Sequence, residues 1–305
     1  MRVAVVFPGQ GTQSPGMGAP WQDHPAWKIV EQVEAALGEP LAPLLLDAPA
    51  EQLARTREAQ LAVLCTSLVA WECARPLLDN VVAFAGHSLG QVTALIASGA
   101  LDLADGVRFA ARRAELTQAA ADAHPGRMAA LLGATIEQAE DACTAAPDAC
   151  WVANDNAPGQ VVIAGTPAGV DAAIARAKDV GVRRTAALNV GGAFHTPLMA
   201  SARTALVGVL ADVVFAPPGA PVVSNHDGTA YTDGDGWRDR LPEHVTVPVQ
   251  WRSSMLTLAG LGAVAFTEIG HGSMIAGVAK RTVPGVSVFA GGTPEECARL
   301  AAVTA

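Results

Sequence analysis

Ser88 stands at the centre of Gly86-His87-Ser88-Leu89-Gly90, between the apolar run 81–85 and a helical pattern over 92–98. A strand that turns this sharply into a helix needs glycines on both sides of the serine, because side chains would not fit there. The turn also puts the hydroxyl at a helix N-terminus, where free backbone N–H groups favour negative charge. The spacing predicts a nucleophile for carbonyl groups, with the Leu89 N–H helping to hold the oxyanion. The alternative is a tight turn that carries a serine by chance.

A serine nucleophile needs a base, and the chain has seven histidines. Four of them precede a proline or lie in polar segments: His24, His124, His226 and His244. His87 adjoins the serine on the turn and is expected to face away from it. His195 follows Gly191 and Gly192, at a return between two parts of the chain. A histidine in such a turn can face a cleft, which favours His195 as the base and leaves the others open.

Arg113 is the cation most suited to meet an anion. The pattern over 105–123 predicts a helix in which Arg113 shares one face with Phe109 and Leu116. Arg112 lies on a different, charged face. An inward arginine must meet an anion or carbonyl groups, because an unpaired buried guanidinium is costly. The alternative is that its stem lies along the apolar row while its head group reaches water.

The composition narrows the class of protein. Of 305 residues, 50% are hydrophobic and 16% are charged, which is typical of a globular chain. The net charge of -9 argues against nucleic acid or an anionic membrane as the main partner. Five cysteines lack a C-x-x-C pair, so disulfides and a metal site are not expected. With no signal-peptide pattern and no apolar run long enough for a bilayer, we expect a cytoplasmic protein.

The elements around Ser88 predict an α/β-hydrolase-like domain. Val3–Phe7 is continuously apolar, as in a strand buried on both faces of a parallel sheet, and further apolar strands are expected at 263–269 and 286–290. The loop 8–13 then lies where such sheets contact ligands, although it lacks the third glycine of a dinucleotide site. A buried helix is predicted over 61–71.

Residues 127–190 predict an inserted subdomain in an otherwise continuous domain formed by 1–126 and 191–305. Its order is β-α-β-β-α-β, which is typical of a ferredoxin-like unit. Asn154, Asn156 and Gly159 are expected in the hairpin between its middle strands. The six elements are predicted at 128–132, 136–145, 150–153, 161–164, 167–179 and 182–188.

Six motifs in this order carry a family resemblance. Together they resemble the malonyl-CoA:acyl carrier protein transacylases of fatty-acid synthesis and the related acyltransferase domains of polyketide synthases, over nearly the whole chain. The motifs are Phe7–Gln13, Gly86–Gly90, Gly126–Ala130, Asn156–Gly165, Ala193–Thr196 and Pro248–Trp251.

The resemblance implies a Ser–His dyad, with Ser88 as the nucleophile and His195 as the base. The partner of the histidine would be the backbone carbonyl of Gln250 rather than a carboxylate. The oxyanion would be held by the N–H groups of Gln10 and Leu89. A serine ester would form from the thioester, and a second thiol would then release it.

The resemblance also implies the substrates. Malonyl-CoA would be the donor and the phosphopantetheine thiol of an acyl carrier protein the acceptor, without cofactor or metal. Arg113 would pair with the free carboxylate of malonate. Phe194, next to the base, would favour malonyl over methylmalonyl, because its ring occupies the space of an α-methyl branch.

The chain departs from the family pattern at three places: Gln91 in place of Glu, Gln60-Leu61 in place of Gln-Pro, and Gly270-His271-Gly272 in place of Gly-Pro-Gly. These departures leave open whether the pathway is fatty-acid or polyketide synthesis. Three alternative functions also remain: a serine esterase or thioesterase, a catalytically silent protein that docks carrier proteins, and the transacylase component of a malonate decarboxylase.

Overall fold

The fold is built on a six-stranded sheet with the order β10-β9-β1-β2-β7-β8. The computed structural model describes residues 1–304. All neighbouring strands of this sheet are parallel except the β7–β8 pair. Its strands are β1 (Val3–Phe7), β2 (Val81–Gly86), β7 (Val222–Val223), β8 (Ala230–Tyr231), β9 (Ala265–Ile269) and β10 (Ser287–Gly291).

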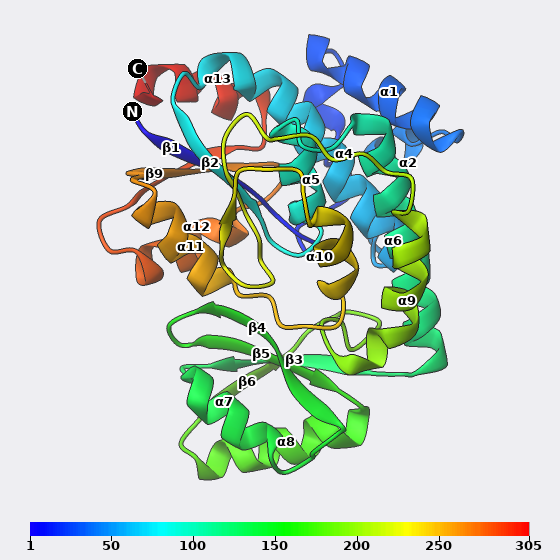
Figure 1. The fold of residues 1–305 in the computed structure, drawn as a ribbon, viewed down its shortest axis with the longest axis vertical. Helices are drawn as coiled ribbons and strands as arrows, with labels where there is room; N and C mark the ends of the chain where they lie inside the picture. Colours follow the sequence, from blue (N-terminus) through cyan, green and yellow to red (C-terminus); the bar gives the residue numbers. More distant parts are fainter. Residues whose placement is uncertain (305) are drawn as a thin grey trace.

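Alternate residues of β1 enter two different cores, as expected of a strand that is covered on both faces. Val3, Val5 and Phe7 pack in the larger core, whereas Ala4 and Val6 pack in the smaller one. The helices of the larger core are α1 (Lys28–Leu37), α4 (Thr56–Ala74), α5 (Gly90–Ala97), α6 (Leu103–Ala123), α9 (Ala200–Val209) and α13 (Pro294–Thr304). The opposite face is covered by α11 (Trp251–Gly260) and α12 (Met274–Thr282) (Figure 1).

Short helices complete the large domain. They are α2 (Ala42–Leu46), α3 (Ala50–Leu53) and α10 (Trp237–Glu243), with 3-10 turns at Ala19–Trp21, Pro25–Trp27, Arg75–Leu77 and Pro197–Met199. The apolar segment predicted as a buried helix is the centre of α4, and it is buried on all sides from Ala59 to Ala70. A helix without a polar face belongs in the interior of a layered fold.

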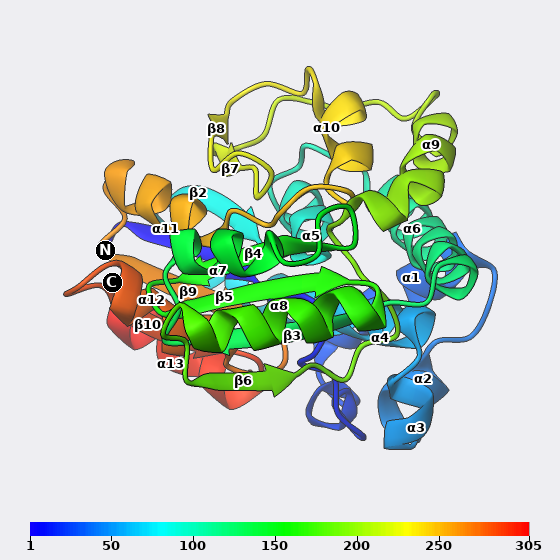
Figure 2. The ribbon, with the colours of Figure 1, turned by 90° about the horizontal axis from the view of Figure 1, so that it is seen from below.

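A second, antiparallel sheet has the order β4-β5-β3-β6. This is the strand order of a ferredoxin-like unit, and it confirms the predicted β-α-β-β-α-β fold. Its helices cover one face of the sheet (Figures 1 and 2), and the other face turns towards the large domain. The elements are β3 (Arg127–Leu132), α7 (Ile136–Cys143), β4 (Cys150–Ala157), β5 (Gln160–Gly165), α8 (Pro167–Asp179) and β6 (Arg184–Ala187).

The hairpin of this sheet differs from the prediction. Strand β4 continues to Ala157, so Asn154 and Asn156 belong to the strand and the turn is formed by Pro158 and Gly159. Gly159 has a φ of 77°, a conformation that favours glycine. The two asparagines are therefore available to the space between the two sheets rather than to a surface turn.

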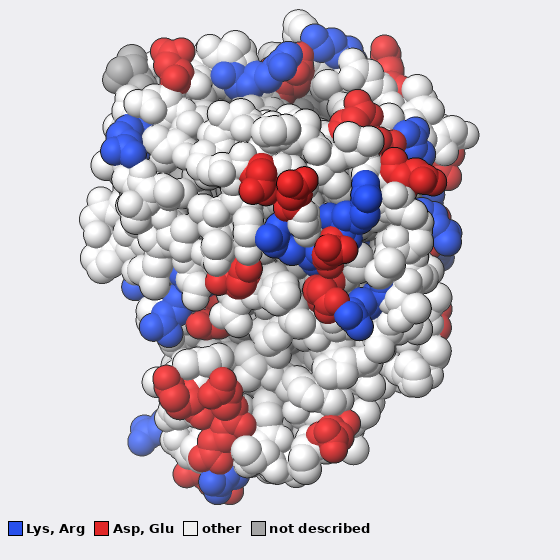
Figure 3. Space-filling model, in the orientation of Figure 1, with Lys and Arg blue, Asp and Glu red and all other residues white. Residues whose placement is uncertain are grey.

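The surface carries no single field of basic residues on the face shown in Figure 3. Acidic side chains gather over α7, which contains Glu137, Glu140 and Asp141, and elsewhere on that face acidic and basic side chains are mixed. Among residues 1–304, no helix has the length and apolar character needed to cross a membrane.

Candidate active site

The nucleophile elbow forms where β2 ends at Gly86 and α5 begins at Gly90. Ser88 has a φ of 52°, a strained conformation for a residue with a side chain. The two glycines are required by space: a Cβ on Gly86 would lie 1.8 Å from the Gly90 carbonyl oxygen, and one on Gly90 would lie 2.4 Å from that of Phe7. The predicted strand–turn–helix is therefore present, with the serine at its apex.

Ser88 and His195 are brought together from positions 107 residues apart. The Ser88 Oγ lies 2.8 Å from the His195 Nε2. His195 is buried and has a φ of 62°, and its backbone N–H donates to the Val245 carbonyl at 3.1 Å. The glycine-flanked histidine thus reaches the elbow, as a serine nucleophile and its base require.

The carbonyl that orients His195 belongs to His244. The His195 Nδ1 donates to the His244 oxygen at 2.7 Å. The prediction that Gln250 supplies this carbonyl is wrong. Gln250 is the residue before α11, and its oxygen accepts the N–H and hydroxyl of Ser254 in the first turn of that helix. Its carbonyl is therefore committed to α11.

His195 is held in the form that a general base needs. A carbonyl only accepts, so the Nδ1 carries the hydrogen and the Nε2 lone pair faces Ser88. Burial, with a further effect of the nearby Arg113 charge, lowers the pKa of His195 to about 3. The imidazole is therefore neutral at physiological pH.

Arg113 reaches the same hydroxyl. Its Nη2 lies 3.1 Å from the Ser88 Oγ, and its Nη1 donates to the Gln60 Oε1 at 2.7 Å. Arg113 is buried whereas Arg112 is exposed and pairs with Glu115, as the row pattern of α6 predicts. Burial lowers the pKa of Arg113 to about 10, which keeps the guanidinium charged at neutral pH.

Arg113 has amide and hydroxyl partners in place of a carboxylate. Among the ion pairs found within residues 1–304, none includes Arg113. Gln60 in turn donates to the Gln10 side chain at 3.4 Å. A buried cation beside Ser88 that is held only by neutral groups can bind an anionic group that enters the cavity.

These groups line a cavity of about 480 Å³ between the two sheets. Gln10 and Leu89 line it beside Ser88, and the His87 N–H donates to the Phe7 carbonyl, which fixes the elbow against the loop after β1. Phe194 also lines the cavity and packs against both the large core and the small sheet.

The small sheet contributes a contact that the sequence analysis missed. The Asn156 Oδ1 lies 2.9 Å from the His87 Nε2, so β4 is joined to the elbow. His87 is half-buried, lines the cavity and packs edge-on against Trp251 rather than facing away from the site, and its partial removal from water lowers the pKa of its imidazole. The Asn-rich end of β4 was the available signal, but its polar residues are also typical of a turn.

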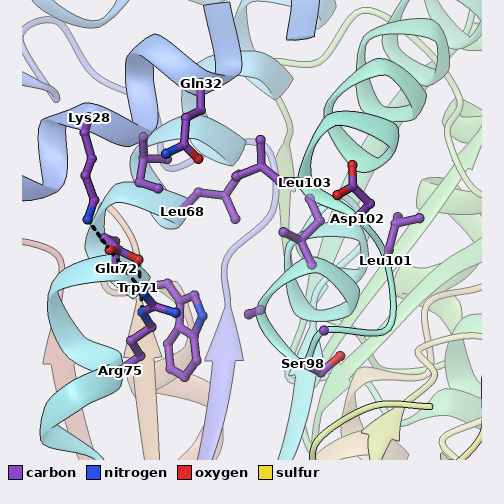
Figure 4. Close-up of a pocket in the computed structure, with 14 residues that line it drawn as sticks. Lys28, Gln32, Leu68, Trp71, Glu72, Arg75, Ser98, Leu101, Asp102 and Leu103 are labelled. Atoms are coloured by element: carbon purple, nitrogen blue, oxygen red, sulfur yellow. Dashed lines mark hydrogen bonds and ion pairs between the residues drawn. The ribbon is translucent and has the colours of Figure 1, made fainter. Parts of the chain in front are cut away.

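Size alone does not mark the active site. A hollow of about 650 Å³ lies between α1, α4 and the α5–α6 connection (Figure 4). There Glu72 already pairs with both Lys28 and Arg75, and Ser98 donates to the Leu95 carbonyl. Among the described residues that line this hollow, the Ser98 hydroxyl has no histidine beside it, and the charges of Lys28, Glu72 and Arg75 are already paired with one another.

No group of three or more His, Cys, Asp or Glu side chains in residues 1–304 could hold a metal ion. The five cysteines are all free. The polar groups that line the cavity include the Ser88 hydroxyl, the His195 imidazole and the Arg113 guanidinium.

The chain is similar to known proteins over nearly its full length. The family profile described as acyl transferase domain matches residues 4–287. The malonyl CoA-acyl carrier protein transacylase of Escherichia coli K12 is 37% identical over 302 residues, which are 97% of each chain. The malonyl-CoA:acyl carrier protein transacylase structure from Xanthomonas oryzae has a TM-score of 0.94 and 35% identity, with 99% of each chain covered.

A third likeness includes a partner protein. A solved complex of a type II polyketide synthase acyl carrier protein with its malonyl-transacylase matches with a TM-score of 0.95 and 30% identity, covering 99% of this chain and 100% of that one. With an elbow serine, a carbonyl-oriented histidine and a family match over most of its length, this chain belongs to the acyl transferase family.

Proposed function

We propose that this enzyme transfers a malonyl group from coenzyme A to the phosphopantetheine thiol of an acyl carrier protein. The observation that carries the proposal is the buried Arg113, which lies 3.1 Å from the nucleophile Ser88 without a carboxylate partner of its own. The full-length relatives that are named as malonyl transacylases support the same substrate class. Malonate is the acyl group whose second carboxylate this cation would hold.

In the first half-reaction, the Ser88 Oγ attacks the thioester carbon while the His195 Nε2 takes the hydroxyl proton. The C–S bond then breaks, His195 gives that proton to the sulfur, and coenzyme A leaves as the free thiol. Gln10 and Leu89 are the proposed N–H donors to the oxyanion. Arg113 holds the malonyl carboxylate and so fixes the acyl group over Ser88.

In the second half-reaction, the carrier thiol gives its proton to His195 and attacks the serine ester. The ester C–O bond breaks, and the Ser88 oxygen regains a proton from His195. A nucleophile, a base and oxyanion donors suffice for both steps, so the proposed reaction includes no cofactor or metal. It covers carriers of fatty-acid and polyketide synthesis alike, because both present the same thiol.

The proposal assigns parts of the chain to roles. Residues 127–190 act as the subdomain that closes one side of the cleft, and residues 1–126 and 191–305 carry the dyad. Phe194 limits the space beside the acyl group. We place the enzyme in the cytoplasm, because free thiols such as its five cysteines persist in reducing compartments.

Intact-mass spectrometry tests the proposal. Wild type incubated with malonyl-CoA gains one malonyl group and loses it when a holo acyl carrier protein is added, which then carries the group. Ser88→Ala gains none. A malonyl group on Ser88→Ala, or an acyl-enzyme that water releases as fast as the carrier does, contradicts the proposal.

A further inference from the structure

The His244 carbonyl that orients His195 lies in an irregular segment, so contacts outside regular secondary structure must fix its direction. His244 is the residue after α10, and the chain has no regular structure from there to α11. The His244 carbonyl shares its peptide plane with the Val245 N–H, which makes only a long hydrogen bond of 3.4 Å to the Pro242 carbonyl, so a side chain that fixes His244 further limits rotation of that plane. The His244 ring is buried, and its Nε2 lies 3.2 Å from the Ser224 Oγ.

Ser224 is itself held firmly. It follows β7, at the end of a strand of the central sheet, and it is fully buried. Its N–H donates to the Thr229 carbonyl, and its carbonyl accepts from the Gly228 N–H, which closes a tight turn. The hydroxyl is therefore presented from the rigid sheet rather than from a free loop.

The direction of the Ser224–His244 hydrogen bond follows from its neighbours. The His226 N–H donates to the Ser224 Oγ at 3.2 Å, so the hydroxyl hydrogen is free to donate to the His244 Nε2. The His226 ring packs edge-on against the His244 ring with centroids 5.9 Å apart. The ring is thus fixed by one hydrogen bond and one aromatic contact.

We infer that His244 is a positioning residue through its side chain: the Ser224 hydroxyl fixes the His244 ring and thereby aims the His244 carbonyl at the His195 Nδ1. The inference rests on the proposed function only in taking Ser88 and His195 as nucleophile and base. A chain of contacts then runs from β7 through Ser224 and His244 to His195 and Ser88. Loss of the Ser224 hydroxyl loosens His195 without touching the substrate cavity.

The first test is Ser224→Ala, with Ser98→Ala as the matched control. Both changes remove one buried serine hydroxyl, and that of Ser98 serves only the Leu95 carbonyl at the end of α5. Modification of Ser88 by a fluorophosphonate probe requires the base but no carboxylate or carrier: a P–O bond forms, fluoride leaves, and His195 takes the proton. We expect this rate to fall about tenfold in Ser224→Ala, since small misplacements of a reacting group are costly, and to stay within about twofold of wild type in Ser98→Ala.

Two further readouts separate positioning from loss of folding. The Nδ1–H proton of His195, assigned by its absence in His195→Ala, should shift or broaden in the NMR spectrum of Ser224→Ala. For malonyl-CoA, the kcat of acyl-enzyme formation should fall while KM stays within about twofold, because Ser224 does not line the cavity.

A second pair of variants keeps the inference testable if Ser224→Ala does not fold. In His244→Gln the side-chain oxygen can still accept from the Ser224 hydroxyl, whereas His244→Leu cannot accept. The probe rate should be close to wild type in His244→Gln and about tenfold lower in His244→Leu.

Equal probe rates in His244→Gln and His244→Leu, or an unchanged rate and an unmoved His195 resonance in a folded Ser224→Ala, overturn the inference while leaving the proposed function intact. If instead malonyl-CoA fails to acylate wild type but the probe rate falls as described, the positioning role stands and the proposed substrate is wrong.

Discussion

At the scale of residues, two groups contact the same hydroxyl from different sides. Arg113 and His195 both lie within hydrogen-bond distance of the Ser88 Oγ. The guanidinium charge lowers the pKa of His195, because it disfavours an imidazolium nearby. A malonyl carboxylate bound to Arg113 would offset that charge and raise the basicity of His195 at the moment when the base is needed.

The pKa of His195 gives a pH prediction. Since the base works when unprotonated and its pKa is about 3, the rate of Ser88 labelling by an uncharged probe should stay level from pH 8 down to about 5. Arg113→Ala removes a cause of the low pKa and should move the fall in rate to higher pH. A wild-type rate that is halved near pH 6.5 would mean that the pKa of His195 is not lowered, and would contradict the prediction.

Arg113 should decide which acyl groups are accepted. Arg113→Ala is expected to lose about 1.5–3 kcal/mol of transition-state stabilisation for malonyl transfer, because a charge-assisted pair disappears. Its activity on acetyl-CoA should rise relative to that on malonyl-CoA. Arg112→Ala is the control, since Arg112 is exposed and pairs with Glu115 on the surface. The measurement is kcat/KM for both substrates. Equal effects of the two substitutions would remove Arg113 from substrate recognition.

Phe194 should restrict the branch on the acyl group. Its ring lines the cavity beside His195, so Phe194→Ser is expected to raise the use of methylmalonyl-CoA relative to malonyl-CoA. One methyl group discriminates by only about 1–3 kcal/mol, so the preference of wild type should be graded. The ratio of kcat/KM for the two substrates measures it, and an unchanged ratio in Phe194→Ser would mean that the ring only packs the domain junction.

At the scale of elements, the elbow is limited by space on both sides of the serine. Gly86→Ala should prevent stable folding or lower stability severely, because its Cβ would overlap the backbone of Gly90. Gly208→Ala is the control: Gly208 lies in α9 with open space around its Cβ position, and alanine there should stabilise by about 0.5–1 kcal/mol. Urea unfolding measures both. A Gly86→Ala protein as stable as wild type would show that the turn can relax.

Periodicity in the sequence predicts elements best where burial is continuous or one-sided. The apolar β1 and α4 and the rows of α6 were predictable because side-chain spacing alone decides which face is buried. The end of β4 was not, because Asn154 and Asn156 line the cavity between the two sheets and polar residues in a strand resemble a turn. Helix α12 was also missed.

The identity of the orienting carbonyl could not be predicted for a different reason. Every residue has the same carbonyl group, so no residue type distinguishes His244 from Gln250 in this role. The choice depends on where the segment between α10 and α11 passes His195, which is set by contacts 49 residues apart in the chain. Ser88, His195 and Arg113, in contrast, have side chains whose chemistry and sequence context made them candidates.

At the scale of the whole molecule, buried histidines should make the protein sensitive to acid. The pKa values of His87, His195 and His244 are all lowered, chiefly by burial, from an ordinary value of 6.5. Below that value the unfolded chain binds protons that the folded chain does not, so stability should fall as pH falls from about 6.5 towards 5. Urea unfolding at several pH values measures this, and a constant free energy of unfolding over that range would contradict it.

Glu268 should act in the opposite direction. Burial raises its pKa to about 7 from an ordinary 4.5, although it accepts N–H groups from the start of α12. Between pH 4.5 and about 7 the folded chain keeps Glu268 protonated whereas the unfolded chain does not. The stability that protonated Glu268 contributes is therefore fully present below pH 4.5 and is lost as pH rises through 7. Glu268→Gln should therefore gain stability relative to wild type between pH 5 and 8. A difference that does not change with pH would exclude this role.

The cavity is lined by residues from Gln10 to Met274, and the N-terminal strand β1 lies between β2 and β9, which is formed by residues near the C-terminus. This has a consequence for synthesis on the ribosome. A nascent chain that has emerged only as far as residue 240 contains Ser88 and His195, but it lacks the carbonyl of His244 and strand β9, one of the two strands that flank β1. We therefore expect Ser88 to become reactive only after His244 and β9 have been synthesised and have packed beside β1.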